Sequence, residues 1–233
     1  MKIIKRKINE FLSKHPKLEE IVTTPEKLTD ASLYFSFSIG LVFTLFCIIS
    51  GLFENTRWFM TLGTYNFVLA LIKLFTALEM QRLIRKPLDA ESLTIREARI
   101  CCISGIALLT VNLAFIGITA ETIIRNHAMH YHPFILFFLI LFSIIRFIVL
   151  FISAIRNRKD RASLNHALRV INLTEALVSV YTTQTAVLDS YMSSEVLRLV
   201  LNLTASSLIF YAILRLSVGL ILSARDALAK IQA

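Results

Sequence analysis

The chain alternates between long apolar runs and short polar segments. Six runs of roughly 20 residues are mostly apolar, and they cover residues 31–53, 58–79, 100–123, 134–155, 168–188 and 197–222. At about 1.5 Å per residue, a helix of this length reaches roughly 30 Å, the thickness of the hydrocarbon core of a bilayer. Because lipid offers no water to backbone groups, such runs must be helical. The pattern predicts an all-α polytopic membrane protein with six transmembrane helices.

The charge distribution predicts how this thread crosses the membrane. The 233 residues are 56% hydrophobic and carry a formal net charge of +9. Basic residues gather before the first run, between the second and third, between the fourth and fifth, and after the sixth. The connecting segments on the opposite side of the membrane hold only three basic residues, Arg57, Arg125 and Arg198. The positive-inside rule therefore places both termini in the cytoplasm, and the basic excess indicates anionic lipids at the cytosolic face rather than nucleic acid.

Three regions follow from this pattern. Residues 1–29 are predicted to form a cytosolic or interfacial amphipathic helix, because Ile3, Ile4, Ile8, Phe11 and Leu12 recur at helical spacing with lysines on the other face. That helix either lies on the membrane surface or docks under the bundle. Residues 30–224 form the six-helix transmembrane domain, whose first helix can begin at Pro25, and residues 225–233 form a cytosolic tail.

Ionisable residues inside the runs are the first candidates for function, because charges within a bilayer are costly and usually face a protein interior or a wet cavity. They are Lys73, Glu79, Arg146, Glu175 and Arg215, with Glu121 near an outer end. Arg146 and Arg215 lie about 15 Å from the basic inner flank of their helices. Side chains tilt toward the N-terminus of a helix, so these cations point away from the cytosol and cannot easily snorkel to it.

The depths of these residues predict their partners. Lys73 and Glu175 lie at matching depths, and we expect an ion pair between them. Arg146 and Arg215 are expected to have no acidic residue at their level. Two explanations of these arginines stay open: structural bonding to serine, threonine or backbone oxygens, or a wet cavity that receives an anion or a lipid headgroup.

The fifth run carries one polar stripe. Asn172, Glu175, Ser179 and Thr182 recur at intervals of three and four residues, so they lie on one face of a helix. A lipid-facing helix would not carry this stripe, and we therefore predict that the fifth span is the most central, with Asn112 of the third span among its facing groups. Polar bonding between helices explains the stripe as well as a solute pathway does.

Metal and enzyme chemistry find little support in the sequence. His127, His130 and His132 are weak candidates for a zinc site, because one short loop rarely supplies the three or four ligands that zinc needs. No nucleophile elbow and no metalloprotease motif is present. We expect no cofactor, no metal and no enzymatic activity, although intramembrane catalysis stays open.

A resemblance lies in spans four to six. Its residues are His130-Tyr131, Arg146, Asn172, the segment 176–179 (Ala-Leu-Val-Ser) and the segment 184–186 (Gln-Thr-Ala). In these residues the chain resembles a family of uncharacterised six-pass membrane proteins from Gram-positive bacteria. The resemblance implies a multi-pass protein of the bacterial cytoplasmic membrane and implies nothing about substrate.

These observations favour a permease-like or channel-like protein that handles a small anionic solute or a lipid headgroup in a polar cavity around the fifth span. The candidate substrate-binding residues are Lys73, Arg146, Arg215, Glu175, Asn172, Ser179, Thr182 and Asn112. The alternative is a non-catalytic accessory subunit or scaffold of a membrane complex, whose polar stripe engages a partner. A homo-oligomer is compatible with both.

Overall fold

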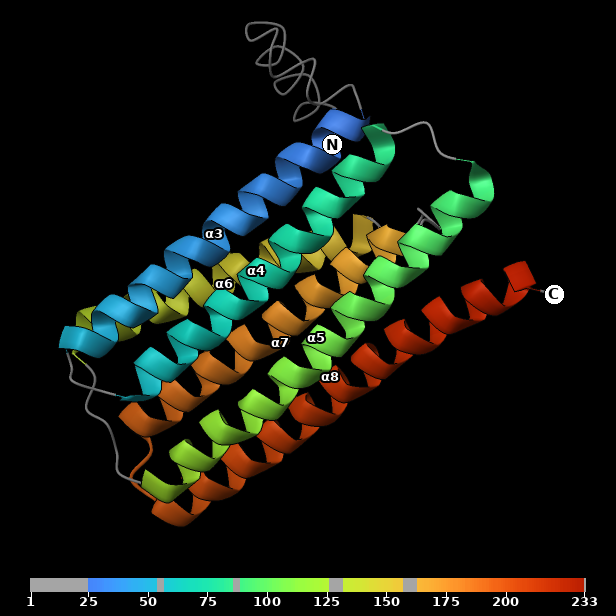
Figure 1. Cartoon of the computed structure of the whole chain (residues 1–233). Helices are drawn as coiled ribbons and strands as arrows, with labels where there is room; N and C mark the ends of the chain where they lie inside the picture. Colours follow the sequence, from blue (N-terminus) through green and yellow to red (C-terminus); the bar gives the residue numbers. More distant parts are fainter. Residues whose placement is uncertain (1–24, 54–56, 86–88, 126–131, 157–162, 233) are drawn as a thin grey trace, which may run out of the picture. The chain divides into compact units, whose positions relative to one another are not determined.

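The computed structural model describes residues 25–53, 57–85, 89–125, 132–156 and 163–232, and every regular element in these ranges is an α-helix. Labelled as in Figure 1, the helices are α3 (Pro25–Phe53), α4 (Arg57–Arg85), α5 (Ala90–Arg125), α6 (Pro133–Arg156), α7 (Ser163–Tyr191) and α8 (Glu195–Gln232). Each apolar run identified in the sequence lies within one of them. The prediction of an all-α fold is confirmed for the described chain.

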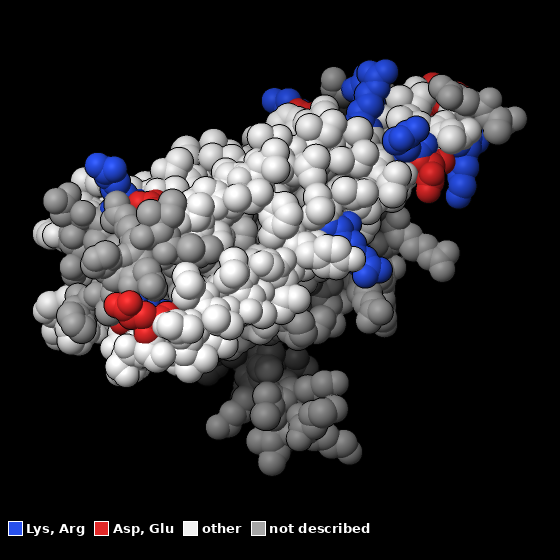
Figure 2. All heavy atoms as spheres, turned by 90° about the horizontal axis from the view of Figure 1, so that it is seen from below, with Lys and Arg blue, Asp and Glu red and all other residues white. Residues whose placement is uncertain are grey.

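Four of these helices are long and apolar enough to cross a membrane. The qualifying segments are Arg57–Leu83, Glu91–Thr122, Pro133–Leu150 and Glu195–Ile231, and a shorter apolar segment, Phe37–Phe53, lies in α3. On the face shown in Figure 2, charged side chains gather toward the ends of the helices, and most of the surface between them is uncharged. Large apolar side chains such as Phe137 and Leu208 are exposed along the helices. These features indicate a membrane protein.

The ends of the helices follow from local sequence. The described part of α3 begins at Pro25, the residue at which the sequence predicts a start, and α8 starts directly after Ser194, whose hydroxyl accepts a hydrogen bond from the backbone N–H of Leu197 at 3.5 Å. At its other end, α8 continues as helix to Gln232, so most of the predicted cytosolic tail, residues 225–233, extends the last helix. The predicted amphipathic helix falls mostly on residues 1–24, which lie outside the described residues.

The chain divides into two compact units, Met1–Ser38 and Ile39–Ala233. Within the second unit, successive helices run in alternating directions (Figure 1). Helix α7 packs against α4, α5, α6 and α8. From Asn165 to Ser190, Val180 is the one residue of α7 that is exposed. The prediction that the fifth span is the most central helix is therefore confirmed.

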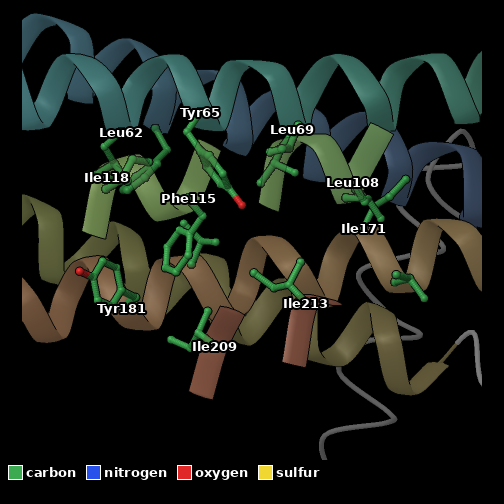
Figure 3. Packing of buried hydrophobic residues seen from close by; sticks show 14 of the residues in the cluster. Leu62, Tyr65, Leu69, Leu108, Phe115, Ile118, Ile171, Tyr181, Ile209 and Ile213 are labelled. Carbon is green, nitrogen blue, oxygen red and sulfur yellow. The ribbon is translucent and has the colours of Figure 1, made fainter. Parts of the chain in front are cut away.

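Aromatic rings hold α4, α5 and α7 together. Phe115 of α5 lies between Tyr65 of α4 and Tyr181 of α7, at centroid distances of 6.0 Å and 5.1 Å (Figure 3). Leu62 and Leu69 of α4 are fully buried beside them. Edge-to-face and tilted contacts of this kind stabilise a core beyond the burial of area alone. This layer fixes the spacing of the helices that carry the buried polar groups.

Glycines allow two pairs of helices to approach closely. A Cβ atom on Gly63 of α4 would lie 2.7 Å from Cγ1 of Ile48 on α3. A Cβ atom on Gly105 of α5 would lie 2.7 Å from Cγ1 of Ile221 and 3.2 Å from the backbone oxygen of Ser217, both on α8. Small residues at such contacts are typical of helix packing in membranes.

The contact between α5 and α8 can be tested with two glycines of the same helix. Gly105→Leu should lower stability by about 1 to 3 kcal/mol, because the new side chain overpacks the contact with α8. Gly117→Leu is the matched control, since nothing lies within 4 Å of a Cβ atom there. The midpoint of thermal unfolding in detergent measures both. Equal shifts for the two variants would contradict the close approach.

Candidate functional site

Three helices bring charged side chains together in the centre of the bundle. Nζ of Lys73 on α4 donates to Oε2 of Glu175 on α7 at 3.0 Å, and Nη2 of Arg146 on α6 lies 3.7 Å from the same oxygen. Nη1 of Arg146 donates to Oδ1 of Asn66 on α4 at 2.6 Å. Each of the four residues is at most 1% exposed. We call Asn66, Lys73, Arg146 and Glu175 the buried charge cluster.

The face of the Arg146 guanidinium is covered by an aromatic ring. Cζ of Arg146 lies 4.9 Å from the centroid of Phe43 on α3. A guanidinium over a ring face is attracted by the quadrupole of the ring, and the attraction grows when the pair is away from water. Arg146 is therefore held on three sides, by Asn66, Glu175 and Phe43.

The structure confirms one predicted contact and corrects another. Lys73 and Glu175 form the ion pair that their matching depths predicted. The prediction that Arg146 has no acidic residue at its level was wrong, because Glu175 reaches it as well. The error arose because Glu175 was assigned to Lys73 alone, although a single carboxylate oxygen can face two cations.

The buried charge cluster holds one positive charge in surplus when its three ionisable groups are charged. Two cations share one carboxylate, and burying an uncompensated charge is costly. The polar atoms are also incompletely bonded: Nε and Nη2 of Arg146 and Oε1 of Glu175 make no hydrogen bond with a described residue. Buried polar atoms are nearly always paired, so such atoms are candidates for contact with a bound species or water. The arrangement can accept a small anion.

Tyr65 adds a hydroxyl group to the same region. It precedes Asn66 on α4 and lies within electrostatic range of both Arg146 and Glu175. Its side chain is 4% exposed, and its hydroxyl has no hydrogen-bond partner among the described residues. A phenolic hydroxyl can donate a hydrogen bond to an anion. Within the buried charge cluster, Asn66 and Glu175 act as acceptors instead.

The rest of the predicted polar stripe is buried but bonds mainly within its own helix. Ser179 donates to the backbone oxygen of Glu175 at 2.9 Å, and Thr182 donates to that of Val178 at 2.8 Å. Asn172 is 1% exposed one turn from Glu175. Asn112 of α5 donates to the backbone oxygen of Phe210 on α8 at 3.3 Å, so it joins α5 to α8 rather than lining the buried charge cluster.

Arg215 does not belong with the other cations. It is exposed on α8, whereas Lys73 and Arg146 are buried. Its neighbours on the same face, Leu208, Tyr211, Val218 and Leu222, are exposed as well. The prediction that Arg215 lines the cavity around the fifth span was therefore wrong. Counting residues from the helix end gave its depth, but depth does not tell which way a side chain faces.

A groove between α6 and α7 approaches the buried charge cluster from the surface. Its volume is about 360 Å³, and its lining residues are Ser143, Ile144, Phe147, Ser179, Val180, Thr183 and Gln184. Ser143 lies three residues before Arg146, and Ser179 lies four residues after Glu175. Both are therefore one helical turn from the charges. The hydroxyl of Ser143 is buried without a hydrogen-bond partner among the described residues.

Sequence reasoning missed Asn66, Phe43, Tyr65 and Ser143. A search for ionisable residues passes over amides, hydroxyls and rings, even though an amide inside lipid also needs a partner. Asn66 could have been found, because it lies seven residues before Lys73 and thus on the same face of α4. Phe43 carries no such signal, since aromatic residues are common throughout the apolar runs.

The histidines form no metal site in the part of the chain that the structure describes. His127 and His130 lie outside the described residues. His132 is exposed and stacks on Phe134 at a centroid distance of 5.5 Å. Asp189 of α7 pairs with Arg198 of α8 at 3.6 Å. The described residues contain no group of three His, Cys, Asp or Glu able to hold a metal ion.

The charge balance of the buried charge cluster predicts unequal effects of removing its members. Glu175→Gln leaves Lys73 and Arg146 with no opposite charge and should lower stability by about 3 to 5 kcal/mol. Lys73→Met should cost much less, because Arg146 and Glu175 remain as a balanced pair. Chemical or thermal unfolding in detergent gives both values. Equal losses for the two variants would show that the Lys73–Glu175 contact matters more than the balance of charge.

No protein-family model and no curated protein matches this chain.

Proposed function

We propose that this chain is a six-pass protein of the bacterial cytoplasmic membrane with both termini in the cytoplasm, and that it handles a small anion as a permease or channel. The observation that carries the proposal is that Lys73 and Arg146 share one carboxylate oxygen of Glu175, with no second acidic group among the described residues of the cluster. The anion is either a small solute or the headgroup of a lipid. A small solute can be a halide or can carry negatively charged oxygens, and a lipid headgroup offers negatively charged oxygens to Arg146.

The six-pass topology needs α3 and α7 as spans in addition to the four helices that qualify. α3 contributes the shorter apolar segment Phe37–Phe53, so α7 is the helix that most needs an explanation. This helix is not among the four that qualify as spans by apolar composition. Its polar residues, among them Asn172, Thr174, Glu175 and Ser179, are buried against neighbouring helices rather than exposed. A helix covered on all sides by apolar helices does not need an apolar surface of its own. The composition of α7 is therefore compatible with a span at the centre of a membrane bundle.

The anion would complete the bonding of the buried charge cluster. Nε and Nη2 of Arg146 and the hydroxyl of Tyr65 are donors that no described residue uses. Charge-assisted hydrogen bonds to such donors are among the strongest in proteins. An anion there would offset the surplus charge and satisfy these donors at once.

The groove between α6 and α7 offers a lateral route to this position. Its rim is apolar, with Ile144, Phe147 and Val180, and its floor carries Ser143 and Ser179. Only one helical turn separates these hydroxyls from Arg146 and Glu175. Rotation of the Ser143 and Arg146 side chains would connect the groove with the buried charge cluster. An amphiphile could thus insert its polar end while its apolar part stays in the groove.

The topology can be tested on the full-length chain with single cysteines. After removal of Cys47, Cys101 and Cys102, Asp89→Cys and Ser193→Cys each place one thiol at an exposed position beside α5 or α8. A membrane-impermeant maleimide added to intact cells should label the residue-193 variant only. The residue-89 variant should react only after permeabilisation. Labelling of both from the same side would contradict a crossing by α7.

Anion binding can be tested by neutralising the surplus charge in two independent ways. Asn66→Asp supplies a second carboxylate to Arg146 with almost no change in volume, and Lys73→Met removes one cation. The natural chain should melt at a higher temperature in chloride, nitrate or phosphate than in the bulky anion gluconate at equal ionic strength. Both variants should lose this dependence, because no surplus charge remains. Flux of the stabilising anion into proteoliposomes should fall in parallel.

The control for the anion test is Arg215→Gln, which removes a cation outside the buried charge cluster. It should keep both the anion-dependent melting and the flux. The proposal is wrong if the natural chain melts alike in all the anions. It is equally wrong if Asn66→Asp and Lys73→Met, well folded by size-exclusion chromatography, keep the same anion dependence.

A second candidate function is a non-catalytic accessory subunit, and Arg215 is the observation that favours it. This arginine is exposed in the middle of α8 among exposed apolar side chains, and it makes no hydrogen bond or ion pair with a described residue. A cation in that position inside lipid favours a protein neighbour with an acidic group. Purification in mild detergent separates the two candidates: a stoichiometric partner that Arg215→Gln releases supports the subunit, and anion flux by the purified chain alone supports the permease.

A further inference from the structure

A second polar pocket lies between the C-terminal part of α4 and the N-terminal part of α5. Its volume is about 340 Å³, and its lining residues are Glu79, Arg82, Leu83, Arg96, Arg99 and Ile100. Glu79 lies six residues after Lys73, so the pocket is at least about 9 Å along α4 from the buried charge cluster. We call it the arginine pocket.

The arginine pocket has positive charge that its own residues do not offset. Arg82 forms an ion pair with Glu79, three residues earlier on α4. Arg96 and Arg99 lie one turn apart on α5, and both are exposed. Neither makes a hydrogen bond or an ion pair with a residue that the structure describes. Two guanidinium groups on one face of α5 are thus available to a ligand.

The side chains that line the arginine pocket favour a phosphate ester as its ligand. Planar guanidinium groups bind phosphate oxygens through two parallel hydrogen bonds, which a single compact cation cannot do. Leu83 and Ile100 are 6% and 7% exposed and give the pocket an apolar floor. A ligand that fills the pocket therefore carries a phosphate at one end and apolar groups beside it.

The position of the arginine pocket along the helices identifies the source of this phosphate. α4 and α5 are both long and apolar enough to span a membrane, and the pocket lies where their apolar segments give way to charged residues. Phospholipid phosphates lie at this level, and basic pockets between membrane helices bind anionic headgroups. We propose that the arginine pocket is a binding site for the phosphate headgroup of an anionic phospholipid, held by Arg96 and Arg99. The proposal needs only that α4 and α5 cross the membrane, so it is independent of anion handling at the buried charge cluster.

Native mass spectrometry of the full chain tests this site. Added phosphatidylglycerol should form a one-to-one complex, while phosphatidylcholine, which has the same phosphate but no net charge, should bind more weakly. The double variant Arg96→Gln/Arg99→Gln should bind phosphatidylglycerol roughly tenfold more weakly, since two charge-assisted contacts are lost. Arg225→Gln is the matched control: it removes an exposed arginine of α8 outside the pocket and should leave binding unchanged.

Competition with inorganic phosphate distinguishes a lipid from a free ion. If the arginine pocket is a headgroup site, millimolar phosphate should leave the lipid complex in place, because the apolar floor contributes to binding. Displacement by phosphate alone would overturn the lipid assignment and leave a site for the free anion. Undiminished lipid binding by the double variant, with an unchanged melting temperature, would overturn the site itself. The double variant should weaken lipid binding by the same factor in an Asn66→Asp background, so failure here is separate from failure of the proposed function.

Discussion

One carboxylate oxygen facing two cations is the constraint on which the interior of this protein depends. Oε2 of Glu175 on α7 contacts both Lys73 of α4 and Arg146 of α6. Oδ1 of Asn66 accepts a hydrogen bond from Nη1 of Arg146. Removal of Glu175 would leave both cations without an opposite charge, and removal of Asn66 would leave Nη1 of Arg146 without its acceptor. α4, α6 and α7 are thereby fixed in rotation as well as in depth, because a small turn of any one helix would pull its charged group away. The aromatic contacts of Phe115 with Tyr65 and Tyr181 fix α4 and α7 from the side of α5.

The interior and the exterior of the bundle reverse the usual arrangement of a water-soluble protein. Asn66, Lys73, Arg146 and Glu175 are buried, while large apolar residues such as Phe137 and Leu208 are exposed. This distribution suits a lipid surround, where polar groups gain by facing one another and apolar groups lose nothing by facing outward. Because Arg146 is only 1% exposed, bulk water would screen its attraction for an anion only weakly.

The features that follow from hydropathy alone were predictable, and those that depend on helix rotation were not. The all-α fold, the six runs and the start at Pro25 come from apolar pattern and backbone chemistry along the chain. The pairing of Lys73 with Glu175 came from depth, which sequence counting measures well. The contact of Arg146 with Glu175 and the exposure of Arg215 depend on the direction in which each side chain leaves its helix. That direction is set by packing between helices distant in sequence, which a count of residues does not contain.

The nearly complete burial of α7 has a consequence for how the protein is made. A helix whose stripe contains Asn172, Glu175 and Ser179 partitions poorly into lipid by itself, so the insertion machinery cannot release it as an isolated segment. α6, which precedes it and packs against it, is strongly apolar and can anchor the nascent chain. In the proposed six-pass topology, α7 would enter as the second arm of a hairpin, with the charge on Glu175 already matched by Arg146 and by Lys73 of the earlier α4. The membrane insertion of α7 would then depend on the earlier synthesis of α4 and α6.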